Sequence, residues 1–127
     1  MTPRRLRGTW IPERGEAIWI DHNPQAGREM RDQHPFLVLS SATFHPAVGL
    51  VVGCAMTSAP YNQGSSMAVD LGPIPDRPDA HSYVLCHQLK SFDWKVRGAR
   101  PHPMGVVPAE QLQQVQEIVA QILGFCP

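Results

Sequence analysis

The sequence predicts an α+β fold that is mainly β: a small, strongly bent antiparallel sheet or partial barrel with a C-terminal helix. Thirteen prolines and ten glycines interrupt the 127-residue chain, and the apolar runs between them are short and rich in Val, Ile, Leu and Tyr, as strands are. The connections are typical of turns and loops rather than helical crossovers, which favours antiparallel pairing. One segment near the C-terminus has the periodicity of a long helix.

Five segments are predicted to be strands, namely residues 17–20, 36–39, 50–56, 67–71 and 83–89. The connections between them differ in character. Residues 21–33 form a polar loop that is long enough to overhang a groove. Residues 41–45 predict one helical turn, with Phe44 pointing inward and Pro46 ending the turn. Residues 72–79 are so rich in proline that they predict an irregular surface excursion between strands.

The predicted helix starts at Pro108, which suits a first-turn position because proline needs no N–H partner there. Glu110 complements the positive end of the helix dipole. An apolar face then recurs at helical spacing until Gly124 stops it, formed by Leu112, Val115, Ile118, Val119, Ile122 and Leu123. We expect this face to cover the sheet.

Length and composition bound the class of protein. The chain, with 43% apolar residues, predicts a single domain over residues 1–127, with residues 1–9 as a flexible N-terminal arm. Eleven Lys and Arg balance eleven Asp and Glu, which excludes a strong overall field for a polyanion. Residues 90–100 nevertheless hold four cations against one carboxylate. This segment is either a local basic face or an ordinary solvated surface.

The cysteines and the lack of a membrane signal indicate a cytoplasmic protein. Cys54, Cys86 and Cys126 form no C-x-x-C pair, which favours a reducing compartment. No apolar stretch approaches the roughly 20 residues that cross a bilayer, and the arginines at the N-terminus lack the apolar run of a signal peptide. We therefore expect a cytoplasmic location and no membrane partner.

Five segments carry a resemblance to a known family, and they are Ile18-Trp19-Ile20-Asp21, Gly27-Arg28-Glu29-Met30, His34-Pro35, Ala55-Met56-Thr57-Ser58 and His87-Gln88-Leu89-Lys90-Ser91. In order and spacing they resemble the MazF/PemK/Kid (ChpB-like) toxin endoribonucleases of type II toxin–antitoxin systems, over about residues 10–123. The resemblance implies a metal-independent, sequence-specific endoribonuclease without a cofactor. In this chemistry the 2′-hydroxyl of single-stranded RNA attacks the adjacent phosphate, leaving 2′,3′-cyclic phosphate and 5′-hydroxyl ends. A homodimer, an mRNA substrate and a cognate antitoxin with a disordered acidic tail are also implied.

The resemblance places the catalytic residues at His34, Thr57 and Arg28. Relatives usually carry a catalytic arginine where this chain has His34, so we predict that the imidazole serves as general base or acid. The lost positive charge is expected from Arg28, or from Arg31 in the same loop. Thr57 matches the family's catalytic threonine and can donate a hydrogen bond to a phosphate oxygen, with Ser58 as a lesser candidate. The alternative is a degenerate site in which His34 merely caps a strand.

The same resemblance suggests substrate-binding residues. His87 stands where relatives have aspartate, followed by Gln88 and Lys90, and Glu29 matches a family glutamate that could accept hydrogen bonds from a base. His34 and His87 could divide the acid and base roles if they face one phosphate. Two tryptophans, Trp19 and Trp94, could stack on bases but are more typical of structural positions. The remaining histidines, His22, His45, His81 and His102, show no ligand spacing, so no metal site is predicted.

Two rival functions remain open at this level. The chain could be a catalytically impaired homologue that keeps the fold and binds antitoxin or RNA, since the family's arginine and aspartate are replaced. It could also be a CcdB-like protein that poisons gyrase by protein contact. Thr57 and the long loop over residues 21–33 argue against this last reading, because both follow the ribonuclease branch.

Overall fold

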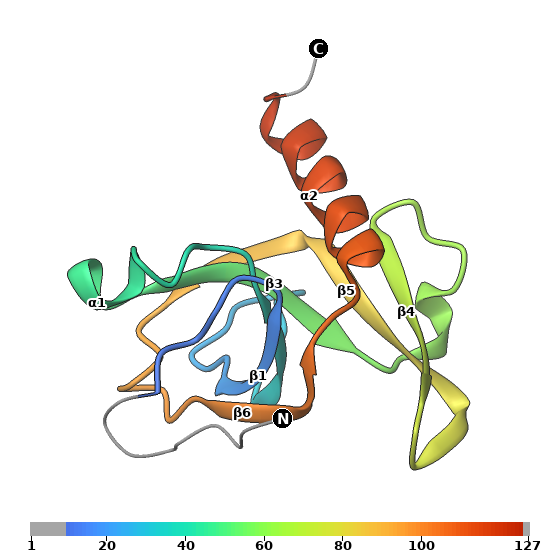
Figure 1. Ribbon diagram of the computed structural model, residues 1–127. Helices are drawn as coiled ribbons and strands as arrows, with labels where there is room; N and C mark the ends of the chain where they lie inside the picture. The colour runs from blue at the N-terminus through green and yellow to red at the C-terminus, as the bar shows by residue number, and fades with distance from the viewer. Residues whose placement is uncertain (1–9, 126–127) are drawn as a thin grey trace.

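A computed structural model describes residues 10–125 as a curled six-stranded sheet with a helix at its C-terminal end (Figure 1). The elements are β1 (Glu16–Asp21), β2 (Gln33–Val38), α1 (His45–Val48), β3 (Val51–Thr57), a 3-10 turn (Pro60–Asn62), β4 (Ala68–Ile74), β5 (Arg77–Phe92), β6 (Arg100–Val106) and α2 (Ala109–Leu123). The strand order is β4-β5-β3-β2-β1-β6, with every pair antiparallel. The predicted fold class is therefore confirmed. The predicted arm, residues 1–9, lies outside the described residues.

The sheet buries both of its faces, which explains why its strands are continuous apolar runs rather than alternating ones. One cluster, which includes Ala17, Leu37 and Met56, packs under α2. The other, which includes Ile18 and Phe36, fills the hollow of the bend. Neighbouring residues on β1 and β2 thus enter opposite clusters, and all of those named here are within 1% of full burial.

Bulges and a close backbone approach produce the curl. Register shifts interrupt the β3–β5 pairing between Cys54 and Met56 and the β1–β6 pairing between Glu16 and Ile18, and such bulges bend a sheet. At Gly53 a Cβ atom would lie 2.0 Å from the Leu37 carbonyl oxygen. Only glycine therefore permits β2 and β3 to approach this closely at the bend.

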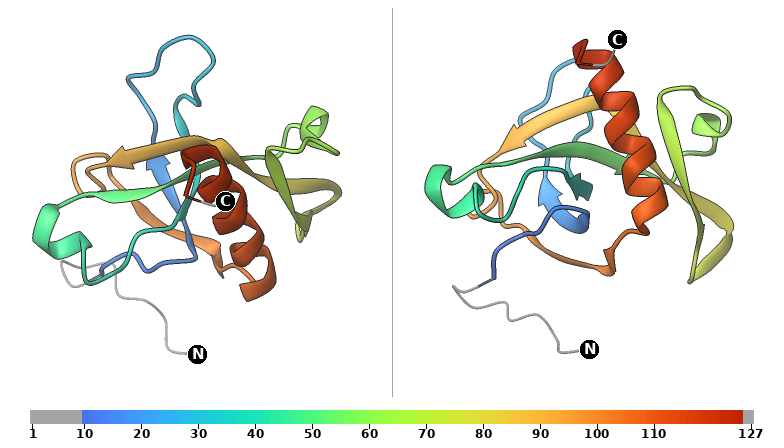
Figure 2. Two further views of the ribbon diagram at one scale, coloured as in Figure 1. Left: turned by 90° about the horizontal axis from the view of Figure 1, so that it is seen from above. Right: turned by 45° about the horizontal axis from the view of Figure 1, so that its top comes forward.

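The C-terminal helix forms as predicted, but its apolar face covers the sheet only in part, because Ile122 and Leu123 are 45% and 46% exposed. α2 packs against β4 and β5 through the buried side chains of Val115 and Val119, and Figure 2 shows it lying across the sheet. Gly124 ends it in a left-handed conformation with φ 77°, and its N–H donates to the carbonyls of Ala120 and Gln121. Pro108 precedes the helix as its N-cap residue rather than occupying the first turn.

The prediction for residues 41–45 is wrong in its boundaries. Helix α1 begins at His45, and Pro46 occupies its first turn instead of ending a turn, because a first-turn proline forfeits no helical hydrogen bond. Phe44 is 41% exposed, while His45 is fully buried. Its Nδ1 lies 2.8 Å from the Pro12 carbonyl oxygen and its Nε2 contacts the Ser40 hydroxyl, so His45 ties the segment before β1 to the core.

Two proline-rich segments form strands that the sequence analysis missed. Residues 72–79 are not irregular, since β4 continues to Ile74, β5 starts at Arg77, and only Pro75 and Asp76 connect them. The unpredicted strand β6 contains Pro101 and Pro103. Both β4 and β6 lie at the edges of the sheet, where a missing N–H disrupts no inner ladder. The amino-acid composition could not indicate these two strands, because the order of strands in a sheet is not visible in the sequence.

Two further features bear on the predictions. In residues 10–125, no helix is long and apolar enough to span a membrane.

Cys54 and Cys86 are buried free thiols, and burial raises the pKa of Cys54 to about 12 and that of Cys86 to about 11. Both thiols are therefore neutral packing groups rather than nucleophiles. Cys126 lies outside the described residues.

Candidate active site

A groove of about 880 Å³ lies where the ends of β2 and β3 meet β6 and the β4–β5 hairpin. Its polar and aromatic lining includes Trp19, His34, Thr57, Ser58, Arg77 and His102. Figure 1 shows the hairpin standing opposite β6, so chain segments distant in sequence form the two sides of the groove. We refer to this feature as the groove throughout.

His34 and Thr57 come together because β2 and β3 are antiparallel. Phe36 pairs with Ala55, Leu37 with Cys54 and Val38 with Gly53. Extending this register by two residues sets His34 opposite Thr57, and both side chains line the groove. The start of one strand thus delivers an imidazole beside the hydroxyl at the end of its neighbour.

The His34 ring is held in one tautomer by the backbone. Its Nδ1 lies 2.7 Å from the carbonyl oxygen of Arg31. A carbonyl only accepts, so Nδ1 carries the proton and donates it. The neutral ring therefore presents an unprotonated Nε2, the nitrogen that can accept a proton from a substrate hydroxyl.

Thr57 keeps a donor free for a ligand. Its Oγ1 accepts a hydrogen bond of 3.2 Å from the backbone N–H of Ala59. This bond uses a lone pair and leaves the hydroxyl proton available to donate. Ser58 follows directly and lines both the groove and a neighbouring hollow.

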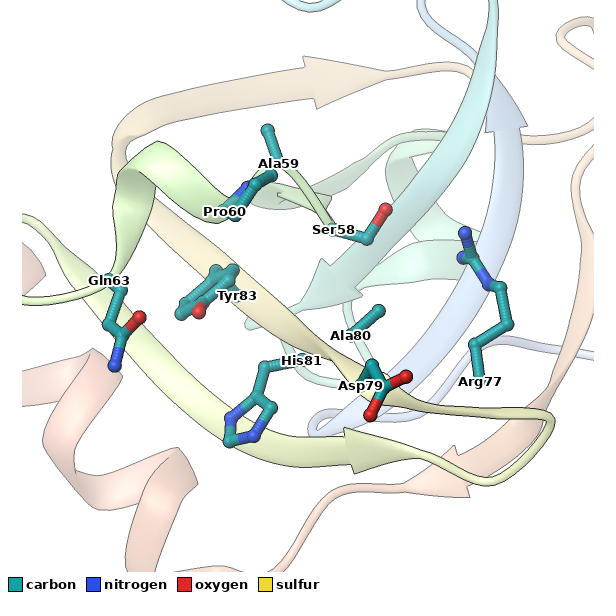
Figure 3. A pocket seen from close by; sticks show the side chains of 9 residues that line it. All are labelled: Ser58, Ala59, Pro60, Gln63, Arg77, Asp79, Ala80, His81 and Tyr83. Carbon is teal, nitrogen blue, oxygen red and sulfur yellow. The ribbon is translucent and has the colours of Figure 1, made fainter.

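The neighbouring hollow, of about 450 Å³, lies between the segment after β3 and the start of β5 (Figure 3). We call it the hairpin hollow, and Ser58 and Arg77 belong to both it and the groove. On its far side His81 pairs with Asp70 at 2.8 Å and stacks beside Tyr83. The two cavities are therefore continuous along the hairpin.

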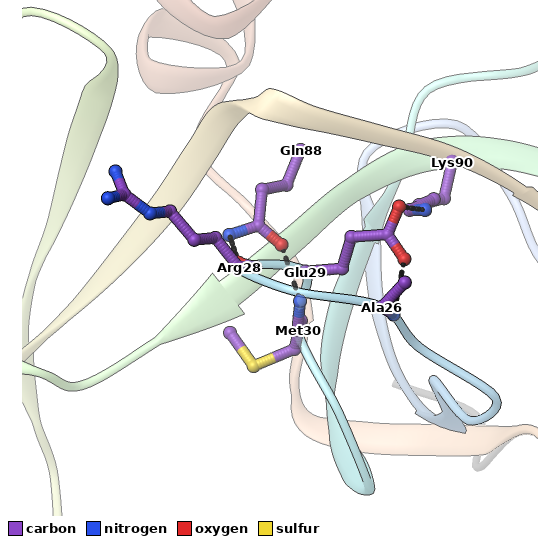
Figure 4. A network of polar contacts seen from close by, with 6 residues as sticks. All are labelled: Ala26, Arg28, Glu29, Met30, Gln88 and Lys90. Atoms are coloured by element: carbon purple, nitrogen blue, oxygen red, sulfur yellow. Dashed lines mark hydrogen bonds and ion pairs between the residues drawn. The ribbon is translucent and has the colours of Figure 1, made fainter.

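Three predicted substrate-binding residues, Glu29, Gln88 and Lys90, bond one another or the loop backbone and do not line the groove (Figure 4). Lys90 Nζ lies 2.6 Å from Glu29 Oε2, and Gln88 Oε1 accepts from the Met30 N–H at 2.7 Å. The Lys90 hydrogen bond, followed by one from the Ala26 N–H, lowers the pKa of Glu29. These contacts fasten the β1–β2 loop to β5, and we refer to them as the loop clamp.

The other predicted residues also lie outside the groove. Arg28 and Arg31 are exposed on the β1–β2 loop and line neither cavity, and Figure 4 shows the Arg28 side chain directed away from the Glu29–Lys90 pair. His87 is exposed on β5. The structure thus does not bring His34 and His87 together at one cavity. Figure 2 shows the loop projecting well apart from the turn of the β4–β5 hairpin.

Comparison with known proteins matches this arrangement to one family. Residues 13–123 match the family of the PemK-like, MazF-like toxins of type II toxin–antitoxin systems. The chain belongs to this family.

Individual relatives support the same family assignment. The PemK/MazF-type chain is 27% identical to the endoribonuclease toxin MazF of Escherichia coli K12, over 91% of this chain and 96% of that protein. A crystal structure of MazF from Deinococcus radiodurans superposes with a TM-score of 0.77 at 30% identity, covering 91% of this chain and 98% of that one. A MazE–MazF structure from the same organism gives 0.72 at 30% identity, covering 92% and 99%.

Within this PemK/MazF fold, two histidines near the site were set aside by the sequence analysis. His102 lines the groove, lies 4.9 Å from the Trp19 ring between centroids, and accepts from the Met104 N–H at Nδ1. Burial lowers its pKa. His22 is only 3% exposed and lies 6.3 Å from the His34 ring. Its Nε2 has no hydrogen-bond partner among the described residues.

Burial, and then the nearby His34, lower the pKa of His22 to about 4. The ring is therefore neutral near pH 7 and packs against the aromatic rings of Phe36 and Phe92. No sequence signal marks either His22 or His102, because long-range pairing of β1 with β2 and β6 places them. Across residues 10–125, no three His, Cys, Asp or Glu side chains gather as a metal-binding group.

Proposed function

We propose that this toxin cleaves single-stranded RNA, in a sequence-specific and metal-independent way, by attack of the 2′-hydroxyl on the adjacent phosphate. The observation that carries the proposal is the pairing of His34, with a free Nε2, and Thr57, with a free hydroxyl proton, in one groove. The relatives named as endoribonucleases support the same class of reaction.

The reaction needs a base, a donor to the phosphate and an acid. His34 Nε2 accepts the 2′-hydroxyl proton as the 2′-oxygen bonds to phosphorus. The Thr57 hydroxyl donates to a non-bridging oxygen, whose negative charge grows in the transition state. The bond from phosphorus to the 5′-oxygen then breaks, and that oxygen takes up a proton from the His34 imidazolium. The products are a 2′,3′-cyclic phosphate and a 5′-hydroxyl.

The proposal includes the biological setting that the resemblance implies. A MazE–MazF structure among the neighbours supports a cognate antitoxin as partner. We infer that its disordered acidic tail binds this chain and restrains cleavage of mRNA. A homodimer in the cytoplasm, Arg28 as a source of charge, and contacts of Glu29, Arg31, Ser58, His87, Gln88 and Lys90 with RNA remain predictions.

The test is to incubate the purified protein with a long unstructured RNA in excess chelator and to analyse the new ends. Cyclic phosphate and 5′-hydroxyl ends are expected, and both His34→Ala and Thr57→Ala should abolish most of them. Thr43→Ala is the matched control, because Thr43 is exposed and its hydroxyl contacts only Ser41. Ends with a 5′-phosphate, or full activity of His34→Ala, would refute the mechanism.

One observation favours a second candidate. The groove holds His34 at the position where the family resemblance implies a catalytic arginine, as expected also of an impaired homologue that binds antitoxin or RNA. Intact RNA in this assay, together with tight binding of the antitoxin, would establish that alternative.

A further inference from the structure

The proposed reaction concentrates negative charge on the phosphate, and this chain lacks an arginine at the start of β2 to offset it. Within the described part of the chain, Arg77 is the only Lys or Arg that lines the groove with His34 and Thr57. The only carboxylate in that lining is Asp76, its neighbour. Among residues 10–125, a single guanidinium therefore lines the cavity in which phosphate charge would develop.

The other Lys and Arg side chains that the structure describes bond or contact other groups, or lie outside the groove. Lys90 bonds Glu29, Arg14 donates to the Leu39 carbonyl, and Arg97 donates to the Asp21 and Asn23 carbonyls. Arg100 lies over the Trp19 ring and Lys95 over the Trp94 ring. By contrast, the Arg77 guanidinium is exposed, and within residues 10–125 it makes no hydrogen bond or ion pair.

The hairpin holds Arg77 in a defined place. Ile74 pairs with Arg77 across a two-residue connection, Pro75 and Asp76, and Pro78 follows. Prolines on both sides restrict the backbone, so the Cα position of Arg77 is rigid while the long side chain stays adjustable. Figure 3 shows the guanidinium extending toward the Ser58 side of the hairpin hollow.

Arg77 also lies at the junction of the two cavities. It and Ser58 line both the groove and the hairpin hollow. An RNA strand that places one nucleotide in the groove and the next in the hollow must pass the connecting phosphate between them. A guanidinium fork at that point matches the geometry of a phosphate and can form two parallel hydrogen bonds to it.

We propose that Arg77 binds the scissile phosphate of RNA and stabilises its developing charge, so that a residue of the β4–β5 hairpin supplies the charge lost at position 34. This rests on the proposed function for the groove. It differs from the prediction that Arg28 supplies the charge, because Arg28 lies on the loop held by the clamp.

The binding test uses an unstructured RNA oligonucleotide and its 2′-O-methyl copy, which has no attacking hydroxyl. Affinity for the 2′-O-methyl copy is measured at several salt concentrations for wild type, Arg77→Ala, Arg77→Lys, Arg28→Ala and the control Lys95→Ala, which removes one cation outside both cavities. Arg77→Ala should weaken binding and reduce the slope of log affinity against log salt by about one phosphate contact. Arg77→Lys should keep the slope, as should Lys95→Ala.

Single-turnover cleavage of the unmodified RNA gives the second readout. Arg77→Ala should slow cleavage by about 10²-fold, as loss of one charge-stabilising donor does, with partial recovery in Arg77→Lys. The proposal is overturned if Arg77→Ala leaves the slope of log affinity against log salt unchanged, or if Arg28→Ala reduces that slope instead. If wild type binds the oligonucleotide but cleaves nothing, the proposed function fails, and the slope still decides whether Arg77 contacts phosphate. No binding by wild type overturns both.

Discussion

The groove and the loop clamp both contain residues that the family resemblance marks as functional, yet their polar groups differ in availability. In the groove, His34 Nε2 and the Thr57 hydroxyl proton are free to meet a ligand. In the clamp, the Glu29, Gln88 and Lys90 side chains are bonded to one another or to the loop backbone. A polar group that is already satisfied contributes to structure, whereas a free one beside a cavity can act on a substrate.

The largest effect expected from this comparison is on the cleavage rate of His34 variants. His34→Ala should lower the rate by about 10²- to 10⁴-fold, the range for loss of a general acid–base group, with little change in melting temperature. The wild-type rate should fall on acidification, because protonation removes the base. His34→Arg should lose this acid limb. A wild-type rate that does not fall on acidification would remove His34 from proton transfer.

The next effect concerns stability and involves His22, buried behind His34. Its pKa is about 4 in the folded chain, below its ordinary value near 6.5. The unfolded chain therefore binds a proton first as pH falls, so stability should be full above about pH 6.5 and decline toward pH 4. The difference between the folded and unfolded pKa of His22 limits this loss of unfolding free energy to about 3 kcal/mol. Urea unfolding at several pH values measures it.

His22→Phe is the matched variant, since Phe fits among the rings of Phe36 and Phe92 and does not titrate. It should reduce the decline in unfolding free energy between pH 6.5 and 4, leaving the part that comes from His45 and His102, whose pKa values burial also lowers. If its decline equals that of wild type, other groups cause the pH dependence and His22 is not the titrating residue.

A smaller effect is expected at Thr57. Thr57→Val removes the hydroxyl but keeps the shape, and should slow cleavage by about ten- to a hundredfold, whereas Thr57→Ser should retain most activity. Single-turnover rates on one RNA decide this. A larger loss in Thr57→Ser than in Thr57→Val would mean that the methyl group, rather than the hydroxyl, matters at this position.

The smallest effect should come from the clamp. Gln88→Ala removes the acceptor for the Met30 N–H and should cost about 1 kcal/mol, speed protease cleavage within the β1–β2 loop, and change RNA cleavage by only a few-fold. Gln88→Glu keeps the acceptor and should retain the clamp. A large loss of RNA cleavage without loosening of the loop would instead place Gln88 on the substrate, and the contrast between the two regions would fail.

The sequence by itself determined the fold class and the chemistry available at the strand ends. Apolar runs and turn residues are local signals, so the four inner strands, the start of β4 and α2 were predictable, as was the presence of His34 and Thr57 at strand termini. Family motifs then connected these positions to RNA cleavage, and the family membership was confirmed.

Only the tertiary structure decided which polar groups share a cavity. The proline-rich segments form β6 and the end of β4 because both strands lie at the edges of the sheet. This arrangement places Arg77 and His102 in the lining of the groove. Glu29 and Lys90 instead bond each other in the loop clamp. These outcomes depend on strand order and on contacts between residues far apart in the sequence, such as Lys90 and Glu29, which are 61 positions apart. Local composition carries no record of such pairings, because their free energy arises only when the chain has closed on itself.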